Sequence, residues 1–153
     1  MKKLFLSFLL AAFLSLSMTA TASASWMWAG SDDKVGIFFK PESIEFEHKG
    51  SLINGDVVYV WWYMLYDDAY AQSHPFMGRT LKKVVTYDKL NLEKVMSKSL
   101  DIIAYDENGD VIYQGSDEAV HRIIPGSHHE VLFNAVAKYV HEHFKEVSDR
   151  TVK

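Results

Sequence analysis

The sequence predicts an α+β fold: an antiparallel sheet of about six strands with a C-terminal helix packed on one face. Three observations lead to this prediction. Segment 57–66 runs for ten residues without a charge, a Gly or a Pro and is rich in Val and aromatic residues, which suit strands. Asn108-Gly109 separates two apolar segments and predicts the tight turn of an antiparallel hairpin. After Ser127, apolar residues recur at helical spacing.

Segment 57–66 is the centre of the predicted sheet. Successive side chains of a strand point to opposite faces, so the odd-numbered residues share one face and the even-numbered residues share the other. Neither set is polar, which predicts a central strand covered on both sides. A buried helix is the alternative, but the content of Val and aromatic residues favours a strand.

Shorter apolar segments supply the other strands. They cover residues 26–29, 34–40, 44–48, 80–88, 97–105 and 111–113. Residues 49–56 hold two turn signals and predict a loop or hairpin end. Segment 90–96 fits either one helical turn or a strand that turns back. Residues 67–79 form the longest irregular connection, which is either a functional loop or a solvated connection with a short helix near 68–72.

The C-terminal segment predicts one amphipathic helix that frays near Ser148. Ser127 and Glu130 have the spacing of a capping box. The apolar face consists of Phe133, Val136, Val140, Phe144 and Val147. This helix is expected to cover one aromatic face of the sheet, which leaves the second face to loops, a partner or a ligand.

The N-terminus predicts a cleaved secretory signal peptide over residues 1–24. A short basic region precedes the apolar segment 4–16, which is shorter than the roughly 20 residues of a membrane-spanning helix. The small residues that follow predict cleavage between Ala24 and Ser25; an uncleaved signal anchor is the alternative. Residues 25–153 then form a single domain. With no Cys for lipidation, we expect an exported protein that is periplasmic, secreted or loosely cell-surface, and not a lipoprotein.

Composition excludes several classes of function. The chain has no Cys, so the fold has no disulfide and no thiol catalysis is possible. Removing the signal peptide leaves 14 basic and 20 acidic residues, which is a formal net charge of −6. An acidic protein is a poor partner for nucleic acid. No second apolar segment is long enough to span a membrane after residue 24.

The histidines give little support for a metal site or a cofactor. The chain has seven, and His128-His129 are adjacent, so their rings point in different directions. No pair has the spacing of a helical metal site, and we expect scattered surface histidines with no metal and no cofactor. The least implausible ligand set is His74 with Asp67 and Asp68.

The sequence also lacks the motifs of common enzymes. Acidic residues cluster at predicted strand ends, where turns favour them for ordinary reasons. No Gly-x-Ser-x-Gly nucleophile elbow occurs. We therefore expect no enzymatic activity; a weakly recognisable hydrolase that uses Asp67 and His74 is the third and least favoured hypothesis.

The order of the motifs resembles a known family. The matching residues are Trp26, Phe38-Phe39, Pro41-Glu42-Ser43-Ile44, Val58-Tyr59-Val60-Trp61, the hairpin 105–112 and Ile124-Pro125-Gly126-Ser127. Together they resemble the surface-adhesin protein E-like domain of bacteria over about residues 26–144. The resemblance implies an antiparallel sheet of about six strands with a C-terminal helix. For the founding adhesin it also implies attachment to host matrix proteins and dimer formation.

The aromatic residues are the strongest functional signal. Trp and Tyr are enriched in interfaces and in ligand pockets, and this chain has more of them than one helix is needed to cover. We expect an exported, non-enzymatic protein that binds a host matrix or envelope protein or its own copy. The binding surface is one sheet face or the loop 67–79, and its candidate residues are Trp61, Tyr63, His74 and Phe76. The alternatives are a carrier of a small apolar ligand or haem on the aromatic face, and aromatic residues that only fill the core.

Overall fold

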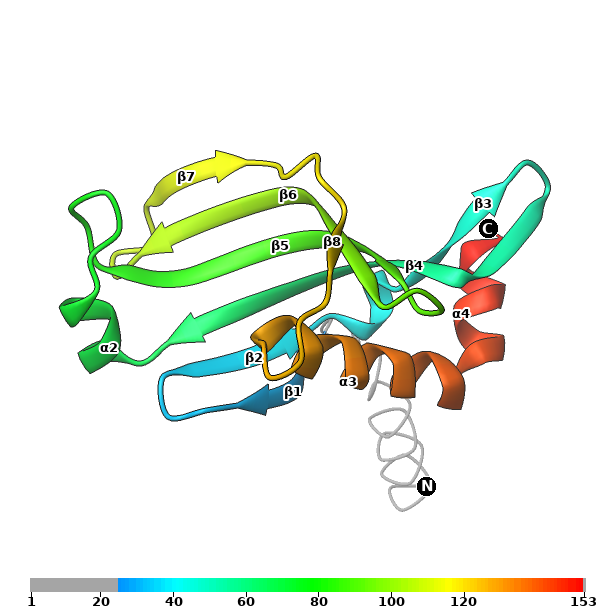
Figure 1. The fold of residues 1–153 in the computed structure, drawn as a ribbon, viewed down its shortest axis with the longest axis horizontal. Helices are drawn as coiled ribbons and strands as arrows, with labels where there is room; N and C mark the ends of the chain where they lie inside the picture. Colours follow the sequence, from blue (N-terminus) through cyan, green and yellow to red (C-terminus); the bar gives the residue numbers. More distant parts are fainter. Residues whose placement is uncertain (1–24, 153) are drawn as a thin grey trace, which may run out of the picture.

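The structure, a computed structural model, describes residues 25–152, which form one antiparallel sheet of eight strands with three α-helices (Figure 1). The strands are β1 (Met27–Ser31), β2 (Val35–Phe39), β3 (Glu45–Lys49), β4 (Leu52–Tyr66), β5 (Leu81–Asn91), β6 (Met96–Asp106), β7 (Val111–Gly115) and β8 (His121–Arg122). The helices are α2 (Asp68–Ser73), α3 (His128–Glu142) and α4 (Phe144–Thr151). The predicted α+β fold class is confirmed. The predicted signal peptide lies outside the described residues.

β4 is the centre of the sheet, as its apolar sequence predicts. The strand order is β1-β2-β4-β5-β6-β7, with antiparallel pairing throughout. β2 and β3 share one edge of β4, where β2 pairs with its C-terminal part and β3 with its N-terminal part. Figure 1 shows α2 and α4 at opposite ends of the sheet.

The prediction of a loop or hairpin end over residues 49–56 is confirmed for its first turn signal, which ends the β3–β4 hairpin, and wrong for its second. The chain turns at Gly50, whose φ of 65° suits a residue without a side chain, and β4 begins at Leu52. Asn54-Gly55 instead lies inside β4, where the pairing with β3 skips from Val58 to Asn54. The turn signal therefore marks an irregularity in the ladder rather than the end of a hairpin.

Two other turns settle the remaining expectations for the sheet. The ambiguous segment 90–96 is a strand that turns back, because β5 continues to Asn91 and β6 starts at Met96. Asn108-Gly109 forms the predicted hairpin turn between β6 and β7, with a φ of 85° at Gly109. The short helix expected near 68–72 is present as α2.

α3 lies along β1 and β2 and closes the core (Figure 1). Ser127 caps it by accepting a hydrogen bond from the Glu130 backbone N–H at 3.2 Å, while the Glu130 carboxylate accepts from the Gly126 N–H at 2.7 Å. The core pairs Leu132, Val136 and Val140 of α3 with buried apolar residues of the sheet, which are Val35, Ile37, Phe39, Val58, Val60, Trp62 and Leu90. Gly30 permits this close packing, because a Cβ there would lie 2.5 Å from Val131 Cγ1.

The single C-terminal helix of the prediction is two helices. α3 ends at Glu142, and His143, with φ −120° and ψ 25°, separates it from α4. Val147 is buried as predicted, but Phe144 is 52% exposed, and its ring packs against the Phe46 ring in a tilted arrangement. α4 is fastened to β3 because Thr151 Oγ1 accepts a hydrogen bond from the Phe46 N–H at 3.0 Å. Within residues 25–152, no helix combines the length and the apolar character needed to cross a membrane.

Replacing Ser127 with Ala is expected to lower the free energy of unfolding by about 1 kcal/mol, because the cap of α3 is lost. Urea unfolding followed by circular dichroism measures the change. Ser116→Ala is the control, since the Ser116 hydroxyl makes only an exposed contact of 3.4 Å with Glu118. Equal stability of the two variants would show that the cap does not hold this helix.

Candidate functional site

The two faces of the sheet differ in what covers them. Even-numbered residues of β4, including Val58, Val60 and Trp62, are buried beneath α3. From Tyr59 to Leu65 the odd-numbered residues of β4 point the other way and are half-buried or exposed, and no helix within residues 25–152 lies over them, whereas Val57 near the start of the strand is buried. The expectation that β4 is covered on both sides is therefore wrong. The uncovered side, here called the open face, includes Phe38, Tyr59, Trp61, Tyr63, Lys83, Val85, Tyr87, Lys89, Ile103 and Tyr105, and the register partners Glu45 and Asp101 lie on the same side.

Aromatic rings on neighbouring strands pack in pairs on the open face. Phe38 and Tyr63 are register partners whose ring centroids lie 4.8 Å apart with an interplanar angle of 16°. Trp61 and Tyr87 are also partners, at 4.9 Å and 22°. Tyr59 stacks on Tyr87 at 6.0 Å, and Trp26 contacts the Tyr63 ring at 4.7 Å. These rings are half-buried by one another rather than by a covering element.

Two lysines complete the surface. Lys83 Nζ lies 4.8 Å from the Tyr105 ring centroid and 6.0 Å from that of Tyr63, which are cation–π distances. Lys89 forms an ion pair with Glu47, and this hydrogen bond raises the pKa of Lys89. The open face is thus an aromatic surface with charges of both signs, since Lys83 lies against its rings, Lys89 is paired with Glu47, and Glu45 and Asp101 lie on the same side.

Tyrosine hydroxyls on the open face stay neutral under ordinary conditions. Partial burial raises the pKa of both Tyr63 and Tyr87 above the usual value. A neutral phenol both donates and accepts a hydrogen bond. The open face therefore offers hydroxyl groups beside apolar rings, which is the combination common in protein interfaces.

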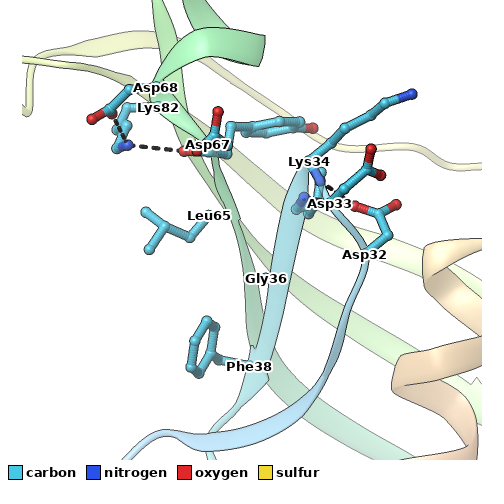
Figure 2. A pocket seen from close by; sticks show the side chains of 11 residues that line it. Asp32, Asp33, Lys34, Gly36, Phe38, Leu65, Asp67, Asp68 and Lys82 are labelled. Carbon is cyan, nitrogen blue, oxygen red and sulfur yellow. Dashed lines mark hydrogen bonds and ion pairs between the residues drawn. The ribbon is translucent and has the colours of Figure 1, made fainter.

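An acidic hollow adjoins one end of the open face. It has a volume of about 340 Å³ and is lined at one side by Phe38, Leu65 and Gly36. Figure 2 shows the Phe38 and Leu65 side chains on the same side of the strands, pointing away from α3. Four carboxylates stand at the other side, those of Asp32, Asp33, Asp67 and Asp68. Asp68 pairs with Lys82, Asp67 caps α2 and Asp32 accepts hydrogen bonds from His128 and the Lys34 N–H, so three of the four are already engaged.

The Asp32 carboxylate is expected to titrate far below its usual range. A hydrogen bond from His128 at 2.8 Å, followed by the Lys34 backbone N–H, lowers the pKa of Asp32 to about 2. Its stabilising contribution is complete above the unfolded pKa and is lost as the pH falls towards 2. NMR titration of the Asp32 carboxyl group measures this directly.

His128→Ala is the matched variant for Asp32, because it removes the largest cause of the lowered pKa and leaves the backbone hydrogen bond in place. The pKa of Asp32 is expected to rise in this variant. An unchanged value would mean that the backbone alone sets it.

The four residues predicted as a binding surface do not form one cluster of contacts. Trp61 and Tyr63 both lie on the open face. His74 instead stacks on Tyr70 at 4.1 Å, and Phe76 contacts the Tyr113 ring at 6.2 Å. His74 and Phe76 therefore belong to the α2 end of the sheet, and their part in binding stays a prediction.

The proposed hydrolase and metal-ligand residues have local structural roles. Asp67 is the N-cap of α2 and accepts hydrogen bonds from Ala69 and Tyr70 N–H groups. His74 is the C-cap, and a helix of six residues separates the two by roughly 9 Å along its axis. Within residues 25–152, no three side chains of His, Asp or Glu gather closely enough to hold a metal ion.

A buried carboxylate beneath α3 is the polar feature that the sequence interpretation missed. Asp88 is fully buried, and its Oδ2 accepts hydrogen bonds from Trp62 Nε1 at 2.9 Å and His129 Nε2 at 2.8 Å. Strand alternation could have identified Asp88, because Thr86, Asp88 and Leu90 lie on the same face of β5. Phe38, Tyr87 and Lys83 were also missed on the open face, since their positions depend on pairing with β4.

Comparison with known proteins finds similarity only at the level of solved structures. The chain matches no known family model, and no curated protein matches it. It is similar to a structure of Haemophilus influenzae protein E, with 16% identity over 85% of this chain and 94% of that chain and a TM-score of 0.49. A second crystal form of that protein gives 14% identity, coverage of 80% and 94%, and a TM-score of 0.49. Protein E from non-typeable Haemophilus influenzae gives 16% identity, coverage of 86% and 84%, and a TM-score of 0.45.

Proposed function

We propose that this chain is an exported, non-enzymatic binding protein that contacts a protein partner through the open face. The observation that carries the proposal is a continuous set of half-buried aromatic rings which no described helix covers. Tyr and Trp contribute large contact area at low entropic cost and dominate binding hot spots. Lys83 places positive charge among the rings, whereas Lys89 is paired with Glu47. The motif resemblance to the protein E-like domain points to the same class of function, with a host matrix or envelope protein as partner.

Binding to a panel of immobilised extracellular-matrix and envelope proteins tests this function. The protein is expressed with its own leader, purified after export and compared with its Trp61→Ala variant. We expect Trp61→Ala to weaken binding by about tenfold or more, as for a central aromatic residue of an interface. Phe144→Ala is the control, because Phe144 is an exposed aromatic residue at the start of α4, outside the set of residues that defines the open face. Binding that responds equally to both variants, or to neither, would contradict the proposal.

A small apolar ligand is the second candidate, and a groove between β1 and α3 favours it. The groove has a volume of about 550 Å³, and its wall includes Trp28, Phe39, Val131 and Tyr139. Pockets of this size and character suit small molecules. A change in tryptophan fluorescence with apolar ligands that disappears in Trp28→Phe would support a carrier. Ligand binding that survives this substitution would exclude the groove.

A further inference from the structure

The segment between α2 and β5, at one end of the sheet (Figure 1), contains a miniature hairpin, residues 75–79, whose tip is Met77-Gly78. The Phe76 N–H donates to the Arg79 carbonyl at 2.9 Å, and the Arg79 N–H donates to the Phe76 carbonyl at 3.0 Å. Both tip residues have positive φ, 51° at Met77 and 75° at Gly78, as a two-residue type I′ turn requires. Asn or Gly usually fills the first of these positions, because most side chains are strained at positive φ. Met77 is therefore a poor residue for the turn itself.

The described part of the fold does not bury Met77 in return for this strain. The residue is 70% exposed, and it lies outside the buried core. The other non-Gly residue with positive φ within residues 25–152 is Val95, and its conformation has a local explanation. The Val95 carbonyl accepts a hydrogen bond from the Ile123 N–H at 3.0 Å, which ties the segment before α3 to the β5–β6 turn. Met77 combines backbone strain with an exposed apolar side chain, and strained residues are concentrated at binding sites.

The base of the 75–79 hairpin is held firmly, although its tip is exposed. Arg79 pairs with the carboxylate of Asp106, which is buried, and with that of Asp110 at 3.0 Å. The Phe76 ring meets the Tyr113 ring edge-on, with 6.2 Å between the centroids. Both arms of the hairpin are thus fixed to β6, β7 and the turn between them. A side chain presented on a fixed backbone loses little conformational freedom when it binds, which favours affinity.

A single projecting Met side chain needs a pocket rather than a flat surface as its counterpart. The side chain is unbranched and polarisable, so it fills irregular apolar pockets, and Met is enriched in protein interfaces. The charged residues of the hairpin and of the β6–β7 turn beside it are Arg79, Asp106, Glu107 and Asp110, one positive and three negative. This excess of negative charge disfavours the anionic surface of a membrane. The counterpart that fits Met77 is an apolar pocket on a protein.

We propose that Met77 is an anchor residue that inserts into an apolar pocket of the protein partner. Met77 lies outside the set of residues that defines the open face, so this contact is a second point of attachment at the α2 end of the sheet. In the free protein the strained turn and the exposed side chain both cost free energy, and only the complex buries the side chain. The inference rests on the proposed function, because it names a further contact with the partner of that function.

Met77→Asn is the variant that tests this inference, because Asn tolerates positive φ and is too polar to fill an apolar pocket. We expect its folding equilibrium constant to rise by about fivefold as the strain is relieved. In the same variant, binding to the immobilised matrix and envelope proteins of the panel is expected to weaken by about tenfold. Urea unfolding and binding measurements on the protein purified after export give the two values. Opposite signs of the two changes distinguish an anchor from a residue that only supports the fold.

Two further variants serve as controls. Val95→Asn relieves the same kind of strain at a different turn, so we expect greater stability and unchanged binding. Met77→Leu keeps the strain and an apolar side chain of similar volume, so the folding constant and the affinity are both expected to change by less than about twofold.

Two results would overturn the inference alone. A Met77→Asn variant that is no more stable than the natural chain would show that the turn is not strained. A more stable variant with undiminished Trp61-dependent binding would show that Met77 does not contact the partner, and the proposed function would stand. Binding that depends on Met77 but not on Trp61 would support the anchor and contradict the role of the open face. If none of the immobilised proteins binds, both the inference and the proposed function fail.

Discussion

Replacing Trp62 with Ala is expected to lower the free energy of unfolding by about 3–5 kcal/mol. The Trp62 side chain is 1% exposed and lies between the sheet and α3, so its removal leaves a cavity in the main core. The indole N–H also donates to the buried carboxylate of Asp88 at 2.9 Å, and this bond is lost with the ring. Equilibrium unfolding in urea, followed by the fluorescence of the remaining tryptophans, measures the difference.

Trp61→Ala is the matched control, because Trp61 is the adjacent residue of the same strand on the open face. We expect a loss of about 1 kcal/mol, which corresponds to the stacking with Tyr87 rather than to a core cavity. The ratio of the two losses therefore tests the assignment of faces. Equal losses would mean that something covers the open face in solution, and the proposal for that face would then be withdrawn.

The contrast between Trp61 and Trp62 also shows what the sequence could and could not predict. Apolar content and the Asn108-Gly109 turn predict strands correctly, because these are local signals. Alternation assigns the two tryptophans to opposite faces, but both faces of segment 57–66 are apolar, so no local signal says which is covered. Which face is covered depends on where α3 packs. The position of α3 is set by its own apolar side and by Gly30, where the helix approaches β1 closely.

Errors at the ends of elements have similar causes. Asn54-Gly55 has the composition of a turn, yet pairing with β3 carries β4 through it and places the turn at Gly50. Helical spacing continues from Phe133 to Val147, but the chain breaks at His143 so that α4 docks on β3. In both cases tertiary pairing decided between local alternatives of similar energy.

Only part of the candidate site could be predicted, because the rest depends on strand pairing that the local sequence does not show. Trp61 and Tyr63 were selected by residue type and do share the open face. Phe38 and Tyr87 could join them only once the register of β2 and β5 against β4 was known. His74 and Phe76 come from the connection 67–79, which was the alternative binding surface, and the structure gives both residues other neighbours.

Replacing His129 with Ala is expected to lower the free energy of unfolding by about 2–3 kcal/mol. Asp88 is completely buried, and only His129 and Trp62 donate to its carboxylate within the described residues; Oδ1 has no partner there. Without His129, a buried carboxylate keeps one hydrogen bond, which costs far more than an exposed carboxylate would. Urea unfolding at neutral pH measures the loss.

His128→Ala separates this effect from a general weakening of α3. His128 is the adjacent residue on the same helix turn, but its partner Asp32 is 43% exposed and returns to water when the pair is broken. A loss below about 1 kcal/mol is expected. Similar losses in both variants would show that helix placement, and not the buried charge, dominates.

The double variant His129→Leu with Asp88→Leu tests whether the buried pair itself adds stability. Replacing both partners removes the charge and its desolvation cost together, but it also leaves the buried Trp62 indole N–H without its acceptor. We therefore expect the double variant to recover part of the stability lost in His129→Ala. The pair then serves to fix α3 over Trp62 and β5 rather than to raise stability. This placement determines which sheet face remains uncovered. A double variant that is stable but loses Trp61-dependent binding would therefore show that binding on the open face depends on the position of α3 on the other face. If it retains that binding, apolar packing alone is enough to position α3.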